Sequence, residues 1–140
     1  MRLREFELEL DYPAVLALWE NAGPGIHVSP SDSQSEITKK LRRDPDLFLL
    51  AEDGGQVVGT VLGGFDGRRG MVYHLAVAAG WRGRGIGSAL MNELEARLKA
   101  RGCRKAYLMV AADNPEVTAF YERRGWELMD ILPMGKEFEA

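Results

Sequence analysis

Hydrophobic positions along the chain follow two spacings, which predict strands in some places and helices in others. Apolar and charged residues alternate, with one slip, over residues 2–10, as expected for an edge strand. Apolar residues then recur at helical spacing over residues 12–23. Ser31 or Ser33 can cap a second helix, which is expected to end before Pro45 because the residue before a proline disfavours helical backbone.

The middle of the chain shows the pattern of β-structure. Two apolar runs, over residues 46–53 and 56–66, flank the pair Gly54–Gly55, and this arrangement predicts a β-hairpin. A turn over residues 67–70 precedes a further expected strand over residues 71–77. Three consecutive strands are therefore expected in this region.

The strongest amphipathic pattern predicts a helix over residues 85–101, with one apolar face made of Ile86, Leu90, Leu94 and Leu98. A strand is expected over residues 104–112, and then a helix over residues 114–125 with Asn114 as its N-cap. The last expected strand covers residues 126–138. The element order βααβββαβαβ predicts an α/β fold with a mixed central sheet of about six strands and helices on both faces.

Length and composition limit the class of protein. With 140 residues, the chain is long enough for a single domain, residues 1–140, whose core needs no metal or disulfide. Its 46% of hydrophobic and 28% of charged residues are typical of a globular rather than a disordered chain. There are 18 basic and 21 acidic residues, and the resulting net charge of −3 argues against a general nucleic-acid-binding protein.

Cysteine content and hydropathy exclude further classes. Cys103 is the single cysteine, so neither a disulfide framework nor a cysteine-based zinc site can form. A buried structural thiol is favoured over a nucleophile at this position. The sequence starts without a signal-peptide block and contains no apolar run of about 18 residues. We therefore expect a soluble cytoplasmic protein with no metal, no membrane partner and no nucleic-acid partner.

Four glycines and two arginines crowd into residues 80–87, directly before the best helix. A glycine loop between a strand and a helix is a ready anion site, because free backbone N–H groups and the positive helix end face the ligand. A nucleoside-triphosphate loop is excluded because its lysine is missing. A dinucleotide loop fits Gly83 and Gly85, but its third glycine is replaced by Ser88.

The remaining alternative is a loop of the form R-x-x-G-x-G, filled by Arg82, Gly85 and Gly87. It resembles the pyrophosphate loop of the GNAT superfamily, the acetyl-coenzyme A-dependent N-acetyltransferases. The stretch VYHLAVAAGWRGRGIGSALMNELE is similar to the central motif of that family over its full length, and NPEVTAFYERRGW is similar to the next motif. The order of elements matches from residue 2 to about 138, and the chain most resembles the small bacterial YpeA-like branch.

The resemblance implies a binding site for acetyl-coenzyme A. The glycines would let the backbone approach the diphosphate, and the two arginines would contact the pyrophosphate or the adenosine 3′-phosphate. The pantetheine arm would pair with the backbone at the end of the strand before the loop. The cofactor-binding residues implied are Leu75, Ala76, Val77, Arg82, Gly83, Arg84, Gly85, Ile86, Gly87, Ser88, Asn114 and Tyr121.

The resemblance also implies catalytic roles. Tyr121 would protonate the departing coenzyme A thiolate, because a phenol carries its proton at neutral pH. The alternative for Tyr121 is an aromatic core residue, although Phe120 suits that role better. Related enzymes often place a basic glutamate on the strand before the loop, where this chain has Tyr73 and His74 instead. His74 could act as the general base or be an ordinary strand histidine. Tyr73 and His27 are candidates for contacting the acceptor.

These residues predict acetyl transfer from acetyl-coenzyme A to a primary amine, by direct attack within a ternary complex. One alternative is a non-catalytic module that binds acyl-coenzyme A and has lost its acceptor site. Another is a dinucleotide-dependent oxidoreductase. The acceptor, the longest acyl group accepted and the oligomeric state stay open, with a homodimer as the common default for small enzymes.

Overall fold

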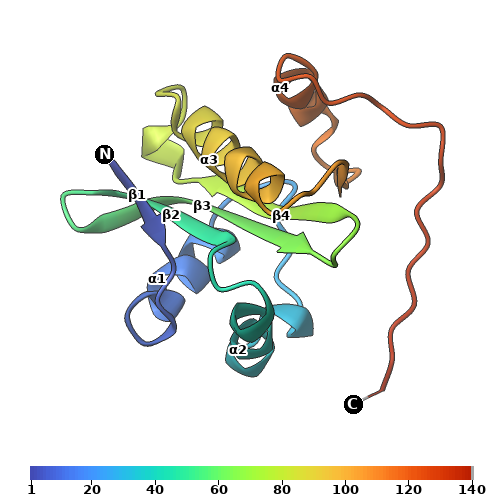
Figure 1. Cartoon of the computed structure of the whole chain (residues 1–140). Helices are drawn as coiled ribbons and strands as arrows, with labels where there is room; N and C mark the ends of the chain where they lie inside the picture. The colour runs from blue at the N-terminus through green and yellow to red at the C-terminus, as the bar shows by residue number, and fades with distance from the viewer. Residues whose placement is uncertain (140) are drawn as a thin grey trace.

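The computed structural model describes residues 1–139 of the chain, and a five-stranded sheet lies at its centre. Helices α1 and α2 cover one face of the sheet and α3 covers the other (Figure 1). The strands are β1 Arg2–Glu5, β2 Phe48–Asp53, β3 Gln56–Phe65, β4 Gly70–Val77 and β5 Ala106–Leu108. The helices are α1 Leu8–Glu20, α2 Gln34–Arg43, α3 Ile86–Ala100 and α4 Thr118–Glu122, with 3₁₀ turns η1 Pro30–Asp32, η2 Ala79–Trp81 and η3 Pro115–Val117. The predicted α/β class is confirmed.

The strands lie side by side in chain order, β1-β2-β3-β4-β5. The first four pair antiparallel, whereas β4 and β5 pair parallel, as expected when a helix connects them. This parallel pairing is short, because it joins only residues 70–72 to residues 106–108. Beyond Val72, within the part of the chain that the structure describes, β4 has no strand on this side. Its end is therefore open at one edge.

Each face of the sheet has its own core. The face under α3 buries Leu49, Ala51 and the predicted apolar face of the helix: Ile86, Leu90, Leu94 and Leu98. The opposite face packs Phe48 and Leu50 against Trp19 of α1 and Ile37 of α2. Alternate residues of β2 thus point into different cores, and its apolar run follows from burial on both faces.

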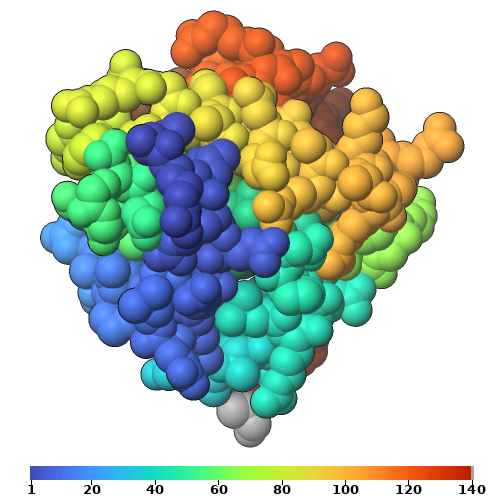
Figure 2. Space-filling view, turned by 60° about the vertical axis from the view of Figure 1, so that its left-hand side comes forward, coloured from blue at the N-terminus to red at the C-terminus, as the bar shows by residue number. Residues whose placement is uncertain are grey.

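The N-terminal prediction was wrong after Glu5, because α1 begins at Leu8 instead of following a longer strand. The reason lies in a tertiary ion pair. Arg4 donates two hydrogen bonds of 2.7 Å to the buried carboxylate of Asp11, which also accepts the backbone N–H of Glu7 at 2.8 Å. This pair fixes the start of α1 against the edge strand. Figure 2 shows that edge, with the N-terminal residues in dark blue below the yellow residues of α3.

The C-terminal predictions need a larger correction. No strand forms over residues 127–139, so the described sheet has five strands instead of about six. The expected strand over residues 104–112 is reduced to β5. Residues after α4 run away from the sheet in Figure 1, and Leu132 is 91% exposed. A strand requires a paired neighbour, which the local pattern cannot supply, and Pro133 has no N–H to donate.

The other predicted elements form, although the expected helix over residues 114–125 is divided into the 3₁₀ turn η3 and the five-residue α4. The hairpin of β2 and β3 turns at Gly54–Gly55, and both glycines have positive φ angles, 57° and 80°. The Ser33 side chain caps α2 by accepting the backbone N–H of Glu36. Among residues 1–139, no helix is both long and apolar enough to cross a membrane.

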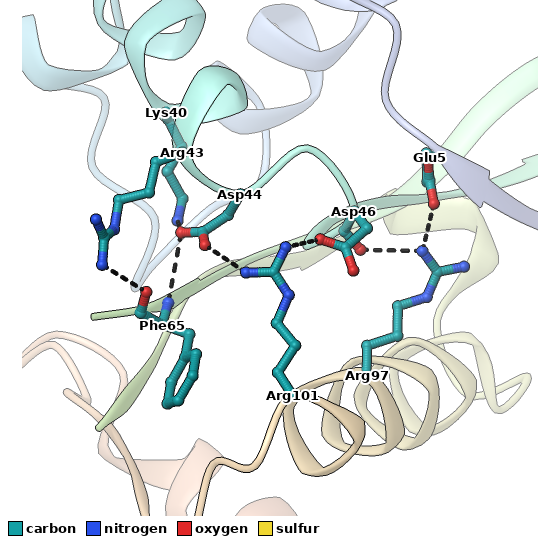
Figure 3. A network of polar contacts seen from close by, with 8 residues as sticks. All are labelled: Glu5, Lys40, Arg43, Asp44, Asp46, Phe65, Arg97 and Arg101. Carbon is teal, nitrogen blue, oxygen red and sulfur yellow. Dashed lines mark hydrogen bonds and ion pairs between the residues drawn. The ribbon is translucent and has the colours of Figure 1, made fainter. Parts of the chain in front are cut away.

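A polar network around Asp44 joins the two helical layers (Figure 3). Asp44 ends α2 and is only 1% exposed. Its carboxylate accepts hydrogen bonds from Lys40 of α2 and from Arg101, which follows α3, the latter at 2.9 Å. Arg101 also binds the exposed carboxylate of Asp46. Because α2 and α3 lie on opposite faces, this network connects them around the end of the sheet.

We expect Asp44→Ala to lower the free energy of unfolding by about 1–3 kcal/mol, since it removes the buried acceptor that Lys40, Arg101 and the backbone N–H of Phe65 share. Asp46→Ala is the matched control, because Asp46 binds the same arginine but its side chain is 37% exposed. Its cost should stay below about 1 kcal/mol, as for surface ion pairs. Urea denaturation of both variants measures the two values. Equal costs would show that burial of Asp44 is not what gives the network its strength.

Candidate functional site

A cleft of about 430 Å³ opens beside the unpaired end of β4. Three parts of the chain enclose it: the segment after α1, the β4 end with the loop before α3, and the segment leading into α4. The lining residues are Ala22, Pro24, Ile26, Leu75, Ala76, Val77, Arg82, Gly87, Asn114, Glu116, Val117 and Phe120. Half of the positions expected from the sequence to contact the cofactor are therefore in one cleft.

The loop before α3 presents free backbone donors. Gly85 occupies the N-cap position and provides no capping side chain, and the first backbone hydrogen bond of the helix runs from Ala89 N to Gly85 O. The amides of residues 86–88 find no acceptor within the described residues. Because these N–H groups sit at the positive end of a 15-residue helix, they form a site suited to an anion.

The three loop glycines have different physical roles. Gly83 and Gly85 have φ angles of 76° and 81°, a left-handed conformation that other residues rarely adopt. Gly87 has helical backbone, and a Cβ at this position would lie 3.5 Å from the ring of Phe120 and 3.9 Å from Val77. Gly83 and Gly85 thus shape the loop, while Gly87 keeps the cleft wall flat.

The two arginines of the loop point to different places. The guanidinium of Arg82 donates to the backbone oxygens of Val77 at 3.1 Å and of Ala22 at 2.6 Å. It therefore ties the end of β4 to the segment after α1. The guanidinium of Arg84 lies over the ring of Trp81, 4.7 Å from its centroid. Arg84 is exposed, so it can turn toward a phosphate without breaking a hydrogen bond to the backbone.

Asn114 closes the cleft on the β5 side. A Cβ at Gly25 would lie 2.7 Å from the Asn114 side-chain nitrogen, so glycine is required there for this close approach. Next to it, His27 Nε2 and Asp113 Oδ2 lie 2.9 Å apart. Hydrogen bonding from His27 lowers the pKa of Asp113. Asn114 occupies the predicted N-cap position, at the start of η3, but its side chain makes no capping hydrogen bond and faces Gly25 instead.

Tyr121 lies next to the cleft but not among its lining residues. Its ring packs edge-on against Phe120 and Trp126 and contacts the core under α3. Burial raises the pKa of the phenol to about 12. The hydroxyl makes no hydrogen bond within residues 1–139, yet it is not enclosed, so it reaches solvent. Phe120, expected to be the core residue, packs against that core and also lines the cleft.

His74 sits at an irregular point of β4, where the pairing with β3 shifts register. Its φ of 45° is the one positive value at a non-glycine residue in the described chain. The imidazole lies 4.6 Å from the Trp19 ring, between centroids, and its Nε2 is 2.9 Å from Oδ1 of Asp32. Tyr73, the preceding residue, is 42% exposed, and burial of part of its side chain raises the pKa of its phenol.

Sequence reasoning missed Asp32 and the cleft-lining role of Phe120. The one available signal for Asp32 is local, since Ser29 and Asp32 form a capping box around η1. That spacing predicts a turn, but it does not predict that the Asp32 carboxylate lies beside His74.

Cys103 is partly buried beside the core under α3, away from the cleft-lining residues. Over the described chain, no three His, Cys, Asp or Glu side chains come together as a metal site.

Comparison with known proteins identifies relatives of this chain. The model of the acetyltransferase (GNAT) family matches residues 12–126. An acetyltransferase of Pectobacterium atrosepticum is 45% identical over 136 residues, which cover 97% of this chain and 94% of that protein.

Solved structures share the fold. Ard1 of Thermoplasma volcanium is similar with a TM-score of 0.80 and 26% identity, over 94% of this chain and 86% of that one. The PaiA N-acetyltransferase of Thermoplasma acidophilum, solved in complex with coenzyme A, has a TM-score of 0.76. It is 19% identical over 93% of this chain and 91% of that one, and so supports the fold alone. By its family match and its 45% identical relative, the chain belongs to the GNAT family and is an acetyltransferase.

Proposed function

We propose that the protein transfers the acetyl group of acetyl-coenzyme A to a primary amine by direct attack in a ternary complex. The observation that carries this proposal is the continuity of the cleft. It runs from the open edge of β4 to the uncapped N-terminus of α3. An extended arm with a diphosphate at one end fits such a path, because the strand edge and the helix end each offer unpaired backbone groups.

The coenzyme A would lie with its pantetheine along Leu75–Val77 and its diphosphate on the amides of residues 86–88. Arg84 would contact a phosphate group directly, since its guanidinium makes no backbone hydrogen bond. Arg82 would hold the cleft in shape by donating from Nε to Val77 and from Nη2 to Ala22, which leaves its Nη1 for a phosphate. Gly83 and Ser88 complete the loop around the diphosphate.

The chemistry requires three proton transfers. The acceptor ammonium loses a proton to His74, and the free amine then attacks the thioester carbonyl carbon. A C–N bond forms, the C–S bond breaks, and the departing thiolate takes the proton of the Tyr121 hydroxyl. The attacking nitrogen then gives up its second proton, which restores the Tyr121 hydroxyl by way of solvent. Because its pKa is raised to about 12, Tyr121 is protonated at neutral pH. No acetyl-enzyme is needed, so the single cysteine plays no part.

The acceptor would approach from the face of the sheet covered by α1 and α2. Tyr73 is exposed there beside His74, and His27 stands at the cleft mouth with its side chain 67% exposed. These groups would contact the acceptor around its amine.

Two loop glycines should respond differently to alanine. Gly87→Ala keeps an allowed backbone, so its stability should change by less than about 1 kcal/mol, but the methyl group enters the cleft and weakens acetyl-coenzyme A binding. Gly85→Ala should weaken binding and also lower the free energy of unfolding by about 1 kcal/mol or more, because φ there is positive. Calorimetric titration and thermal melting separate the two effects.

Gly80→Ala is the control for these variants, because a Cβ there meets no atom within 4 Å and its φ is not positive. It should bind acetyl-coenzyme A like the wild type. Unchanged affinity in both Gly85→Ala and Gly87→Ala would rule out this loop as the cofactor site. Binding of NAD in place of acetyl-coenzyme A would favour an oxidoreductase.

The wild-type protein should release coenzyme A thiol when acetyl-coenzyme A is supplied with a panel of amines, amino acids and peptide N-termini. With the best acceptor, Tyr121→Phe should lower kcat by roughly 10²-fold, the usual scale for a lost general acid, while the ring keeps its packing. In the wild type, ionisation of Tyr121 should cause no loss of rate below about pH 11, one unit under its raised pKa.

Two results would contradict this mechanism. A protein that binds acetyl-coenzyme A but acetylates no amine would be a binding module. Wild-type kinetics in Tyr121→Phe, measured with an accepted amine, would show that Tyr121 is a core residue and that another group protonates the thiolate. In that case Tyr121→Ala should cost about 3–5 kcal/mol of stability, as other aromatic truncations do.

A further inference from the structure

The buried carboxylate of Asp32 pairs with His74. Asp32 Oδ1 lies 2.9 Å from His74 Nε2, with side chains 6% and 19% exposed. We propose that Asp32 is a positioning residue, which holds neutral His74 with its proton on Nε2 and leaves Nδ1 free to take the proton of the acceptor ammonium. This inference rests on the proposed amine acetylation.

Asp32 is fixed on three sides. Its Oδ2 accepts the backbone N–H of Ser29 at 3.1 Å, so one carboxylate oxygen is held by η1 and the other faces the imidazole. Its backbone oxygen accepts the hydroxyl of Tyr12, from α1, at 2.8 Å. A carboxylate held in this way can present only one oxygen to His74. The orientation of the pair is therefore set before any ligand binds.

The imidazole is held with equal firmness. Trp19 packs against one side of the ring, and its indole N–H donates to the hydroxyl of Thr60 at 2.9 Å. Thr60 in turn donates to the backbone oxygen of His74 at 3.1 Å. The left-handed backbone at His74 belongs to a class of conformation that is enriched at functional sites. Two strands and a helix thus fix the position of this one side chain.

The second ring nitrogen is free. Nδ1 makes no hydrogen bond within the described chain, and it is not enclosed, because Arg124 Nε is the one unpaired buried side-chain atom of residues 1–139. Among the groups around His74, Asp32 is the charged one that contacts the ring. The neighbours from α1 and β3 are the uncharged Trp19 and Thr60, and the neighbouring titratable group on β4 is Tyr73. The carboxylate therefore decides which nitrogen carries the proton, as in other acid–histidine pairs.

The proton balance is simple. The acceptor ammonium gives one proton to Nδ1, and His74 becomes an imidazolium with protons on both nitrogens. The Nε2 proton stays between the ring and the Asp32 carboxylate, which lowers the energy of the cation by charge and hydrogen bonding. No proton passes to Asp32. After product release, His74 returns its Nδ1 proton to solvent.

The test uses Asp32→Asn and nitrogen-15 NMR of the imidazoles. Because Ser29 N–H needs an acceptor, the asparagine must turn its oxygen to Ser29 and its NH₂ toward Nε2. This geometry forces the proton of neutral His74 onto Nδ1, where it blocks proton abstraction. The chain has two histidines, so the spectrum of His74→Gln assigns both. We expect the tautomer of His74 to switch, and kcat with the best amine to fall by roughly 10²–10³-fold. Acetyl-coenzyme A affinity should stay within about twofold, since Asp32 lies outside the cleft lining.

Two controls isolate the carboxylate. Ser31→Ala changes the neighbouring side chain of η1, which is exposed, and keeps the carboxylate and its contacts, so it should preserve both the tautomer of His74 and kcat. Asp113→Asn changes the exposed His27–Asp113 pair and should alter the spectrum of His27 alone. If Ser31→Ala reproduced the loss of rate, Asp32 would have a structural role and the proposal would be overturned.

The remaining outcomes separate the two proposals. An unchanged His74 tautomer in Asp32→Asn overturns the positioning role whatever the activity. A switched tautomer with wild-type kcat overturns it as well, because His74 would then not be the base. If the wild type acetylates no amine, amine acetylation fails as the function, while the NMR comparison still decides whether Asp32 sets the tautomer.

Discussion

The short pairing of β4 with β5 is the constraint on which the site depends. Only residues 70–72 of β4 are joined to β5, so the strand edge after Val72 is unpaired on that side. An unpaired strand edge is usually a liability, because it exposes backbone donors and acceptors to other chains. In this acetyltransferase the open edge becomes one wall of the cleft, with Phe120 and Asn114 facing it across the gap. The short pairing thus creates the cleft in which we propose that the cofactor binds.

The two ends of this edge serve different purposes. At one end, the strand runs into the glycine loop and the uncapped first turn of α3, where positive backbone dipoles gather. At the other end, the register shift with β3 turns His74 toward the face that α1 covers, where it meets Trp19 and Asp32. One strand therefore brings an anion site and a titratable pair to neighbouring positions, and the distance between them is set by the rigid backbone of the sheet.

Rigidity comes from polar contacts that cross between layers. Arg82 links the end of β4 to Ala22 after α1, and Asp44 links α2 to the turn after α3. Contacts of this kind are costly to break when one partner is buried, because the remaining group has no water to replace it. They hold the helices of opposite faces in register with the sheet. The two sides of the cleft can therefore keep a fixed geometry.

The sequence by itself determined the order of elements as far as the last helix, the apolar face of α3, the Gly54–Gly55 turn and the glycine loop, because each follows from contacts between residues close in the chain. It also brought the family resemblance and half of the residues that line the cleft: Leu75, Ala76, Val77, Arg82, Gly87 and Asn114. The tertiary structure decided the rest. Arg4 and Asp11 set where β1 ends and α1 begins, the missing neighbour left residues 127–139 without a strand, and the partner of His74 came from 42 residues away. Pairings between distant residues leave no local period in a sequence, so only the folded chain could reveal Asp32.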